Sequence, residues 1–458
     1  MQSLSPLDGR YSQLVNNLEA YFSEPALNRF RSLVEIEWII CLCQKKVLKG
    51  LPFLSETRIK ELRKIAYDFD FKAFQLIERT TGHDVKALEY YIRDRLLESD
   101  EPNAKLLLAV HFGCTSEDIN NLAYTLAIRG AAEQVLLPSV NQLKSVLKEL
   151  AQNWADVPLL AMTHGQPATP TTVGKELAVF AQRLENQISN LKFLEYAGKF
   201  NGSTGTFSAV TFAVPEVAWD EVARDFVTTF GLEYNSLTTQ IDPRDSLSTL
   251  FDILNHCGRI MHNLSTDLWL YISRGIFSLE VNTDQVGSST MPHKVNPIKF
   301  ENAEGNFEMA DALFSLLSNQ LIQSRLQRDL SDSTILRNVG VAFGHWLVGV
   351  NMLVNGLAEL NVNQMVTAEE LSQHYEVLTE AIQTQLRVAG IQGEVTIDDP
   401  YALLKHFSRG KSITAESLRI FIEQLPLSLA DRKKLLELTP SKYIGLAEKL
   451  VYDYFGSR

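Results

Sequence analysis

Four stretches of this chain repeat apolar residues at steps of three and four positions, over residues 173–194, 247–268, 300–321 and 336–357. An α-helix turns once in 3.6 residues, so this spacing places the apolar side chains of each stretch on one face. Each helix would be about 30 Å long at 1.5 Å per residue, and its apolar face needs neighbouring helices to cover it. The sequence therefore predicts an all-α protein built around a left-handed bundle of long helices.

Other patterns divide the chain into segments. Period-two alternation is scarce, and residues 206–214 are the best candidate for a strand. A polar stretch at 98–102 follows an amphipathic helical region. We therefore expect an N-terminal helical domain over residues 1–104, a central long-helix bundle over 105–360 and a C-terminal domain of shorter helices over 361–458. A chain of 458 residues agrees with about three domains of ordinary size.

The charge balance and the cysteines limit the partners and the setting. The 43 basic and 55 acidic side chains leave a formal net charge of −12, which argues against a nucleic-acid partner and an anionic membrane surface. A small anionic substrate is not excluded, because a pocket needs only a few local cations. No signal peptide is expected at the N-terminus. The 4 cysteines are scattered without a Cys-x-x-Cys pair, which favours a reducing, cytoplasmic setting.

One stretch is long enough to cross a bilayer. Residues 338–358 carry no formally charged side chain. However, Asn338, His345, Asn351 and Asn355 interrupt the stretch, and polar groups are costly in hydrocarbon. We expect a helix buried inside the bundle and no membrane partner.

The most unusual polar segment is Gly287-Ser-Ser-Thr-Met-Pro-His-Lys-Val-Asn-Pro297, directly before a long helix. The start of a helix exposes unpaired N–H groups and partial positive charge, which favour anions. Together with Lys294, this position suits the stabilisation of a developing carboxylate or enolate and the loss of a proton from a serine hydroxyl. A flexible turn with a solvated lysine explains the same residues, and the spacing alone does not separate the two interpretations.

Four further polar segments interrupt the apolar pattern. His164 lies in a loop bounded by prolines and suits a general acid, although a structural histidine is the more frequent case. Residues 78–84 and 114–118 form two more such segments, and the second is equally well explained by a helix cap at Thr115 or Ser116. Residues 325–337 contain three arginines suited to holding a phosphate, or to pairing with Asp329 and Asp332.

Motifs for metal and P-loop chemistry are absent from the sequence. Bundle di-metal sites use Glu-x-x-His pairs, and no glutamate stands three residues before any of the 9 histidines. His-Glu-x-x-His and Gly-x-x-x-x-Gly-Lys motifs are also missing. We therefore expect no metal and no cofactor.

Together these segments resemble the fumarase/aspartase superfamily, and most closely its bacterial adenylosuccinate lyase branch. The serine loop is similar to the signature Gly-Ser-Ser-x-Met-Pro-x-Lys-x-Asn-Pro and matches it at every fixed position. Residues 163–172 resemble the histidine loop of these lyases, while residues 79–84, 114–120 and the stretch ending at Arg337 resemble the adenylosuccinate branch. The likeness runs from residue 7 past Arg337 and is more diffuse toward the C-terminus.

The resemblance implies a fumarase/aspartase-like helical bundle and a β-elimination that releases fumarate from an N-succinyl nucleotide. Adenylosuccinate would give AMP, and the purine intermediate SAICAR would give AICAR. The proton to be removed lies next to a carboxylate and is poorly acidic. An enzyme without a metal must therefore supply a base, an acid and a positively charged cradle.

The resemblance also implies roles for individual residues. Ser288 would be the base, stabilised as an alkoxide by Lys294 and the helix start, and His164 would protonate the leaving nitrogen. Matching positions for the succinyl group are Thr115, Ser116, Gln240, Ser289, Lys294, Asn296 and Asn302. Matching positions for the nucleotide and its phosphate are Arg10, Tyr11, His83, Asp84, Arg328, Ser333 and Arg337. His83 would also orient groups around His164. At position 82, directly before His83, this chain has glycine where relatives often carry a polar residue.

Members of this family form homotetramers in which three subunits contribute to each site, so the resemblance implies self-association with shared active sites. One alternative is a sibling enzyme, such as argininosuccinate lyase, fumarase or aspartase. Their substrates have no nucleotide phosphate for the arginines to hold. A second alternative is a non-catalytic helical scaffold, in which substitutions of Ser288 and His164 would be harmless.

Overall fold

The computed structural model describes residues 4–99, 101–280, 291, 294–410 and 412–456. The chain divides into two compact units, each made of segments that are separated in the sequence. Unit 1 comprises Met1–Val140, Asn186–His262 and Ala303–Asn351. Unit 2 comprises Asn141–Glu185, Asn263–Asn302 and Met352–Arg458. The expected division of the sequence near residues 104 and 360 stays a prediction.

The long helices predicted from the apolar repeat are present, and each contributes residues to both units. They are α10 (Val173–Lys192), α13 (Asp245–Ser273), α14 (Ile298–Gln320) and α16 (Val339–Leu357). A further long helix, α9 (Leu137–Asn153), was not predicted from the repeat and also spans both units. A π-helical stretch, η3 (Ala132–Leu136), joins α8 to α9. The prediction of an all-α helical bundle is therefore confirmed.

Besides its parts of the long helices, unit 1 contains shorter helices and one small sheet. The helices are α1 (Ser12–Val15), α2 (Glu19–Phe22), α3 (Glu24–Gln44), α4 (Glu56–Tyr67), α5 (Phe71–Thr81), α6 (Asp84–Leu97), α7 (Ala104–Ala109), α8 (Ser116–Ala131), α11 (Ser208–Ala213), α12 (Trp219–Thr228) and α15 (Ser331–Leu336), with the 3-10 turns η1 (Pro6–Asp8) and η2 (Asn16–Leu18). Strands β3 (Ala197–Gly198) and β4 (Glu233–Tyr234) pair in parallel.

Unit 2 contains two antiparallel strand pairs and the C-terminal helices. Strands β1 (Pro158–Thr163) and β2 (Gln166–Thr172) form one pair, and β5 (Phe277–Leu279) and β6 (Leu360–Val362) form the other. The helices are α17 (Gln364–Ser372), α18 (Thr379–Ile391), α19 (Pro400–Ser408), α20 (Ala415–Glu423), α21 (Leu429–Leu436) and α22 (Ala447–Phe455), with the 3-10 turns η4 (Tyr375–Leu378) and η5 (Pro440–Lys442).

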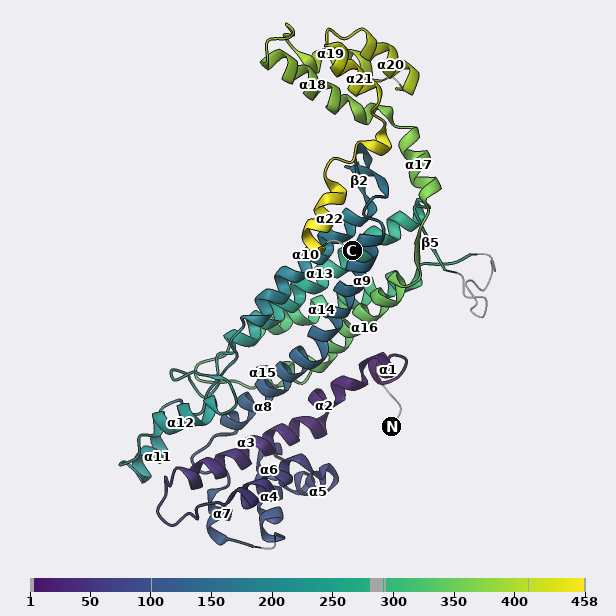
Figure 1. Cartoon of the computed structure of the whole chain (residues 1–458). Coiled ribbons are helices and arrows are strands. Elements are labelled where there is room, and N and C mark those ends of the chain that lie inside the picture. Colours follow the sequence, from purple (N-terminus) through teal and green to yellow (C-terminus); the bar gives the residue numbers. More distant parts are fainter. Residues whose placement is uncertain (1–3, 100, 281–290, 292–293, 411, 457–458) are drawn as a thin grey trace. The chain divides into compact units, whose positions relative to one another are not determined.

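Within unit 1, α13, α14 and α16 pack along their apolar faces (Figure 1). The ring of Phe314 on α14 lies 5.9 Å from Phe251 of α13 and 5.6 Å from Phe343 of α16, measured between ring centroids. Trp346 is fully buried, and its indole N–H donates to the carbonyl of Leu254 at 3.0 Å. The repeat of threes and fours therefore marks the buried face, as predicted.

Residues 206–214, expected as a strand, form helix α11 instead. The N–H groups of Thr211 and Val214 bond to the carbonyls of Phe207 and Val210 within the segment. A strand needs a neighbouring strand for these hydrogen bonds, and the strands that the structure describes pair among themselves. A short polar–apolar alternation without a partner strand was therefore a misleading signal.

The apolar stretch around α16 is mostly covered by protein. Ser331–Leu357 is long and apolar enough to cross a membrane, but 67% of its apolar window is buried. Polar groups on this stretch find protein partners, since the Nδ1 atom of His345 lies 2.9 Å from Oδ1 of Asn306. This arrangement fits the buried bundle helix that the sequence predicted.

The close packing of α14 and α16 predicts different effects for two glycine substitutions. A Cβ atom at Gly349 would lie 2.7 Å from the buried ring of Phe307, whereas Gly305 has no neighbouring atom within 4 Å. Gly349→Ala should lower the free energy of unfolding by about 1–2 kcal/mol despite its better helix propensity. Gly305→Ala is the matched control and should be neutral or stabilising by up to about 1 kcal/mol. Urea unfolding of both variants tests this; equal effects would show that the contact with Phe307 is not tight.

Candidate active site

The predicted site residues are distributed over both units. Unit 1 contains Arg10, Tyr11, His83, Asp84, Thr115, Ser116, Gln240, Arg328, Ser333 and Arg337. Unit 2 contains His164, Lys294, Asn296 and Asn302. Ser288 and Ser289 lie outside the described residues, so their proposed roles stay predictions.

The start of helix α8 carries Thr115 and Ser116. Thr115 is the N-cap residue, and its backbone N–H donates to Oδ2 of Asp118 at 2.8 Å. The second oxygen of Asp118 lies 2.8 Å from Nζ of Lys199, and both side chains are completely buried. The helix cap considered from the sequence is therefore real, and a buried ion pair holds it in place.

Glu117, in the first turn of α8, accepts hydrogen bonds from two arginines. Its Oε2 lies 3.2 Å from Nη2 of Arg244, and its Oε1 lies 3.2 Å from Nη2 of Arg328. The side chain of Asn120 also donates to Oε1, at 2.8 Å. Glu117 is almost completely buried, so its negative charge depends on these donors.

Arg328, which is predicted to bind the nucleotide, contacts Gln240, which is predicted to bind the succinyl group. Its Nη1 donates to Oε1 of Gln240 at 3.1 Å. The amide nitrogen of Gln240 donates in turn to the carbonyl of Ser203 at 3.0 Å. Three separate stretches of unit 1 therefore meet at this guanidinium group.

Asp84 forms a second cluster with two arginines. Its Oδ2 lies 3.0 Å from Nη2 of Arg31 and 3.5 Å from Nη2 of Arg337. Burial raises the pKa of Asp84, but the positive charges and a backbone hydrogen bond outweigh burial and lower it overall. The Nε of Arg31 donates to Oδ1 of Asn120 at 2.8 Å. Asn120 therefore connects this cluster to Glu117.

His83 and Gly82 shape the turn that presents Asp84. His83 is the N-cap of α6, and its Nδ1 accepts from the backbone N–H of Lys86 at 3.2 Å. Gly82 ends α5 with φ of 65°. Glycine and asparagine both adopt this left-handed conformation readily, so a backbone requirement is sufficient to explain the departure at this position.

The remaining predicted residues of unit 1 lie near helix starts. Ser333 is half-buried on the short helix α15, where its N–H donates to Oδ1 of Asp332 at 2.7 Å. Tyr11 is the N-cap of α1, and Arg10 before it is exposed.

In unit 2, His164 occupies the tip of the β1–β2 hairpin instead of an irregular loop. Thr163 pairs with Gln166, so His164 and Gly165 form a two-residue turn with φ of 54° and 71°. Positive φ at both positions is typical of a type I′ turn, which disfavours most side chains at the first position. The turn leaves the imidazole exposed, where a substrate or another chain can reach it.

The base of this hairpin is attached to the C-terminal helices. Leu160 of β1 belongs to the apolar core that α17–α21 form, including Leu371 and Leu386. The hydroxyl of Thr169 on β2 donates to Glu380 of α18, and the hydroxyl of Tyr443 donates to the same carboxylate at 3.4 Å. The C-terminal helices therefore hold the strands that carry His164.

Lys294, Asn296 and Asn302 lie around the start of α14. The helix begins at Ile298, and the carbonyl of Pro297 accepts from the N–H of Glu301 at 3.3 Å. Pro297 therefore directly precedes the first helical residue, Ile298. Lys294 is exposed just before this helix start.

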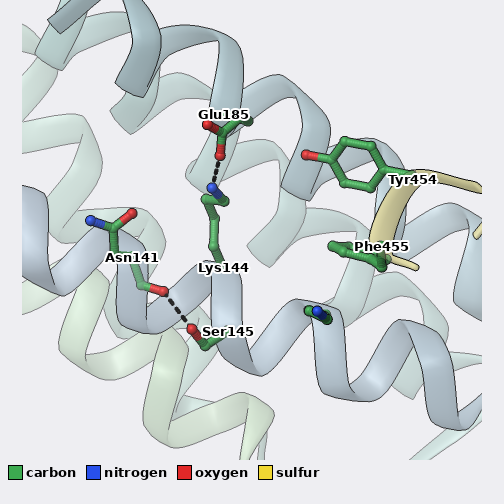
Figure 2. Close-up of a pocket in the computed structure, with 7 residues that line it drawn as sticks. Asn141, Lys144, Ser145, Glu185, Tyr454 and Phe455 are labelled. Atoms are coloured by element: carbon green, nitrogen blue, oxygen red, sulfur yellow. Dashed lines mark hydrogen bonds and ion pairs between the residues drawn. The ribbon is translucent and has the colours of Figure 1, made fainter. Parts of the chain in front are cut away.

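Three hollows in the described part of the chain have volumes of about 420, 470 and 220 Å³, and no predicted site residue lines them. Figure 2 shows the first, in unit 2, where Lys144 points to Glu185 and forms an ion pair with it. The rings of Tyr454 and Phe455 border the same hollow. None of the residues expected to bind the phosphate lines this hollow, so it is not the expected phosphate site.

Among the described residues, no group of three or more His, Cys, Asp or Glu side chains is arranged to hold a metal ion. The expected absence of a metal cofactor stays a prediction.

Sequence reasoning missed several residues that organise unit 1. They are Arg31, Glu117, Asn120 and Arg244. Asp332 was considered as a partner for the arginines of its own segment, but it pairs with Arg244. Glu117 stood inside a segment already considered, but acidic residues in a first helical turn are common and usually exposed. Glu117 differs from such residues because its side chain is buried, and burial is determined by the tertiary structure.

His111 and Glu35 form a buried pair shortly before Thr115. The Nδ1 of His111 lies 2.5 Å from Oε1 of Glu35, whose side chain is completely buried, and the backbone N–H of His111 donates to Oε2 at 3.0 Å. Glu89 lies 3.9 Å from Nε2. Burial lowers the pKa of His111, but the hydrogen bond and charge of Glu35 outweigh burial and raise it overall.

Family models match both parts of the chain. The family described as "Lyase" matches residues 9–309, and "Adenylosuccinate lyase C-terminal" matches residues 324–444. Curated adenylosuccinate lyases from Legionella pneumophila (strain Corby) and Escherichia coli (strain K12) are each 42% identical over 454 residues, 98% of both chains. The adenylosuccinate lyase from Haemophilus influenzae is 41% identical over the same share.

Two solved structures resemble the fold at low sequence identity. A fumarate lyase from Mesorhizobium sp. BNC1 has a TM-score of 0.75 and 17% identity, covering 97% of this chain and 98% of its own. A 3-carboxy-cis,cis-muconate lactonizing enzyme from Pseudomonas putida has a TM-score of 0.69 and 20% identity, covering 96% and 98%. These likenesses concern the fold alone.

The raised pKa of His111 predicts a pH-dependent contribution to stability. The charged pair stabilises the folded state fully below the ordinary histidine pKa of about 6.5, and the contribution is lost as the pH rises through the higher folded value. His111→Gln should therefore lower the free energy of unfolding by about 3 kcal/mol at pH 6 and by less at pH 9.

Urea unfolding at both pH values measures this difference. His374→Gln is the control, because it removes a partly exposed contact with Glu376, and its effect should be smaller at pH 6. A His111→Gln effect that is equal at pH 6 and pH 9 would show that the imidazole is not charged in the folded protein.

Proposed function

The chain belongs to the adenylosuccinate lyase family, and from this membership and its site residues we propose that it cleaves adenylosuccinate to AMP and fumarate, and SAICAR to AICAR and fumarate. The protein is thus a carbon–nitrogen lyase that acts on small-molecule substrates. In the reaction a C–H bond and the neighbouring C–N bond break, a C=C bond forms in fumarate, and the nitrogen gains a proton.

The observation that carries the substrate assignment is the hydrogen-bond network of unit 1. Arg328 lies beside Gln240, and Arg337 lies beside Asp84. These groups come from separate stretches of the chain, and the family resemblance places all four among the substrate contacts. Guanidinium groups bind phosphate through directed, paired hydrogen bonds, and this chemistry suits a nucleotide monophosphate better than a substrate without a phosphate.

In this mechanism Ser288 removes the proton next to the carboxylate. A serine hydroxyl is a weak base, so its alkoxide needs a strongly anion-stabilising environment. The exposed Lys294 and the partial positive charge of the α14 N-terminus support this role. Asn296 and Asn302, also near this start, would hold the succinyl group together with Ser289, Thr115 and Ser116.

His164 donates the proton to the leaving nitrogen. Its exposed position at a turn tip makes the imidazole accessible, and the positive φ of a non-glycine residue is a strain often kept for function. The attachment of the hairpin to α17–α21 supports this role, because proton transfer requires a fixed donor position.

Arg328, Ser333 and Arg337 bind the phosphate, while Arg10, Tyr11, His83 and Asp84 contact the rest of the nucleotide. Arg337 remains about half exposed and Arg328 about one fifth exposed, so both can face a ligand. A small local set of cations therefore reconciles a net charge of −12 with an anionic substrate.

The functional form is a homotetramer in the cytoplasm, with active sites shared between subunits. Apolar side chains left exposed on the long helices, such as Leu270, Met309 and Leu316, support burial against further copies of the chain. The four cysteines are all unpaired, which supports a reducing compartment.

Replacement of the proposed base tests the reaction directly. The wild-type protein should release fumarate from adenylosuccinate but not from argininosuccinate, aspartate or malate. Ser288→Ala should lower kcat on adenylosuccinate by about 10³-fold, because proton removal loses its base, while AMP binding stays within about twofold. An absorbance assay measures turnover of adenylosuccinate, and calorimetry measures AMP binding. Substitution of an exposed serine, Ser372→Ala, is the control. Full turnover by Ser288→Ala would exclude serine as the base.

The acid role of His164 predicts a separation of proton removal from bond cleavage. His164→Gln should lower fumarate release by about 10²- to 10³-fold, since the leaving nitrogen lacks its proton donor. In D₂O this variant should still exchange the substrate C–H proton, so the ratio of exchange to fumarate release should rise, whereas Ser288→Ala should lose both. Proton NMR measures the exchange, and the exposed His406→Gln serves as control. Exchange and release that fall together in His164→Gln would contradict the assignment.

A further inference from the structure

We propose that Arg244 is a positioning residue for phosphate recognition, which joins the helix start at Thr115 to the short helix that carries Ser333. Neither the family resemblance nor the sequence pattern assigned a role to this residue. The inference rests on the proposed function, because it concerns how the phosphate-binding groups of that site are held.

The guanidinium group of Arg244 is buried between two carboxylates. Its Nη2 donates to Oε2 of Glu117 at 3.2 Å, and its Nη1 lies 2.6 Å from Oδ2 of Asp332. All three side chains are at most about 3% exposed. The second contact is an ion pair without hydrogen-bond alignment.

The two carboxylates belong to elements that carry proposed substrate contacts. Glu117 holds the guanidinium group of Arg328 at 3.2 Å. Asp332 directly precedes Ser333 on α15 and accepts its backbone N–H at 2.7 Å. Arg244 therefore fixes the relative position of Arg328 and Ser333 without contacting the phosphate itself.

The backbone of Arg244 supports a specific placement of this side chain. Its φ of 60° lies in the left-handed region, which is unfavourable for a residue with a long side chain. The N–H of Arg244 donates to Oδ1 of the buried Asp242 at 2.8 Å, and this bond holds the strained turn. Strain that is kept by surrounding contacts is typical of sites where geometry matters for function.

The position of two phosphate-binding groups should matter most for ligands that carry a phosphate. Loss of Arg244 should displace Arg328 and Ser333 together, and paired hydrogen bonds to phosphate depend strongly on such placement. AMP should therefore lose affinity, whereas adenosine, which has no phosphate, should be affected little.

The test measures the binding of AMP and adenosine to the full-length protein by calorimetry. Arg244→Met should weaken AMP binding by about tenfold or more and adenosine binding by less than about threefold. Arg58→Met is the matched control in the same unit, because Arg58 is also buried and pairs with Glu61 at 2.9 Å. It should lower thermal stability but leave the AMP-to-adenosine affinity ratio unchanged.

Arg244→Lys keeps the test decisive if the methionine variant fails to fold. Lysine retains the buried positive charge but cannot reach two carboxylates with a planar fork, so its AMP-to-adenosine ratio should lie between the wild-type value and that of Arg244→Met. A folded Arg244→Lys with the wild-type ratio, or equal losses for both ligands, would overturn the positioning role.

The wild-type protein separates this inference from the proposed function. Wild type that binds AMP no better than adenosine would overturn both the proposed phosphate site and the role of Arg244. Wild type that prefers AMP, with Arg244 variants that keep the same preference, would overturn the role of Arg244 alone.

Discussion

A single buried carboxylate, Glu117, organises the part of the structure in which substrate recognition is proposed. It accepts hydrogen bonds from Arg244, Arg328 and Asn120, and Asn120 extends the network to Arg31. A buried charge without partners would be strongly destabilising, so the donors and the carboxylate constrain each other. Because Arg244 and Arg328 come from stretches distant in sequence from helix α8, the position of Glu117 determines how these stretches meet.

Backbone strain is held by surrounding contacts at two positions that the proposed function uses. His164 and Arg244 both have positive φ although neither is glycine. Surrounding contacts hold each of them: Asp242 holds the turn at Arg244, and paired strands hold the turn at His164. The fully buried pair of Asp118 and Lys199 similarly fixes the backbone at Thr115. Such contacts reduce the reorganisation that substrate binding would otherwise require.

The C-terminal helices have a structural role that no motif in their sequence indicated. Leu160 of the His164 hairpin is part of the core that these helices form, and Glu380 accepts hydrogen bonds from Thr169 and Tyr443. The segment therefore supports, from a distance in sequence, the hairpin that carries the proposed acid His164. Such support comes from packing between distant segments, so no local sequence motif indicates it.

The sequence by itself determined the secondary structure of the long helices and the chemistry available at their ends. Apolar periodicity identified α10, α13, α14 and α16, because one helix face must be buried whatever its neighbours are. Polar motifs such as the serine loop indicated the reaction class, because a motif gives directly the side chains that are available for chemistry. Local alternation at residues 206–214 failed, because a strand exists only where another strand can pair with it.

Only the tertiary structure decided which charges are buried and which residues meet. Glu117 and Arg244 look like ordinary surface residues in the sequence, and their roles follow from burial and from contacts between distant segments. The hairpin turn at His164 likewise depends on the pairing of β1 with β2. The physical reason is that desolvation and long-range pairing are properties of the folded chain, and no local pattern of residues records them.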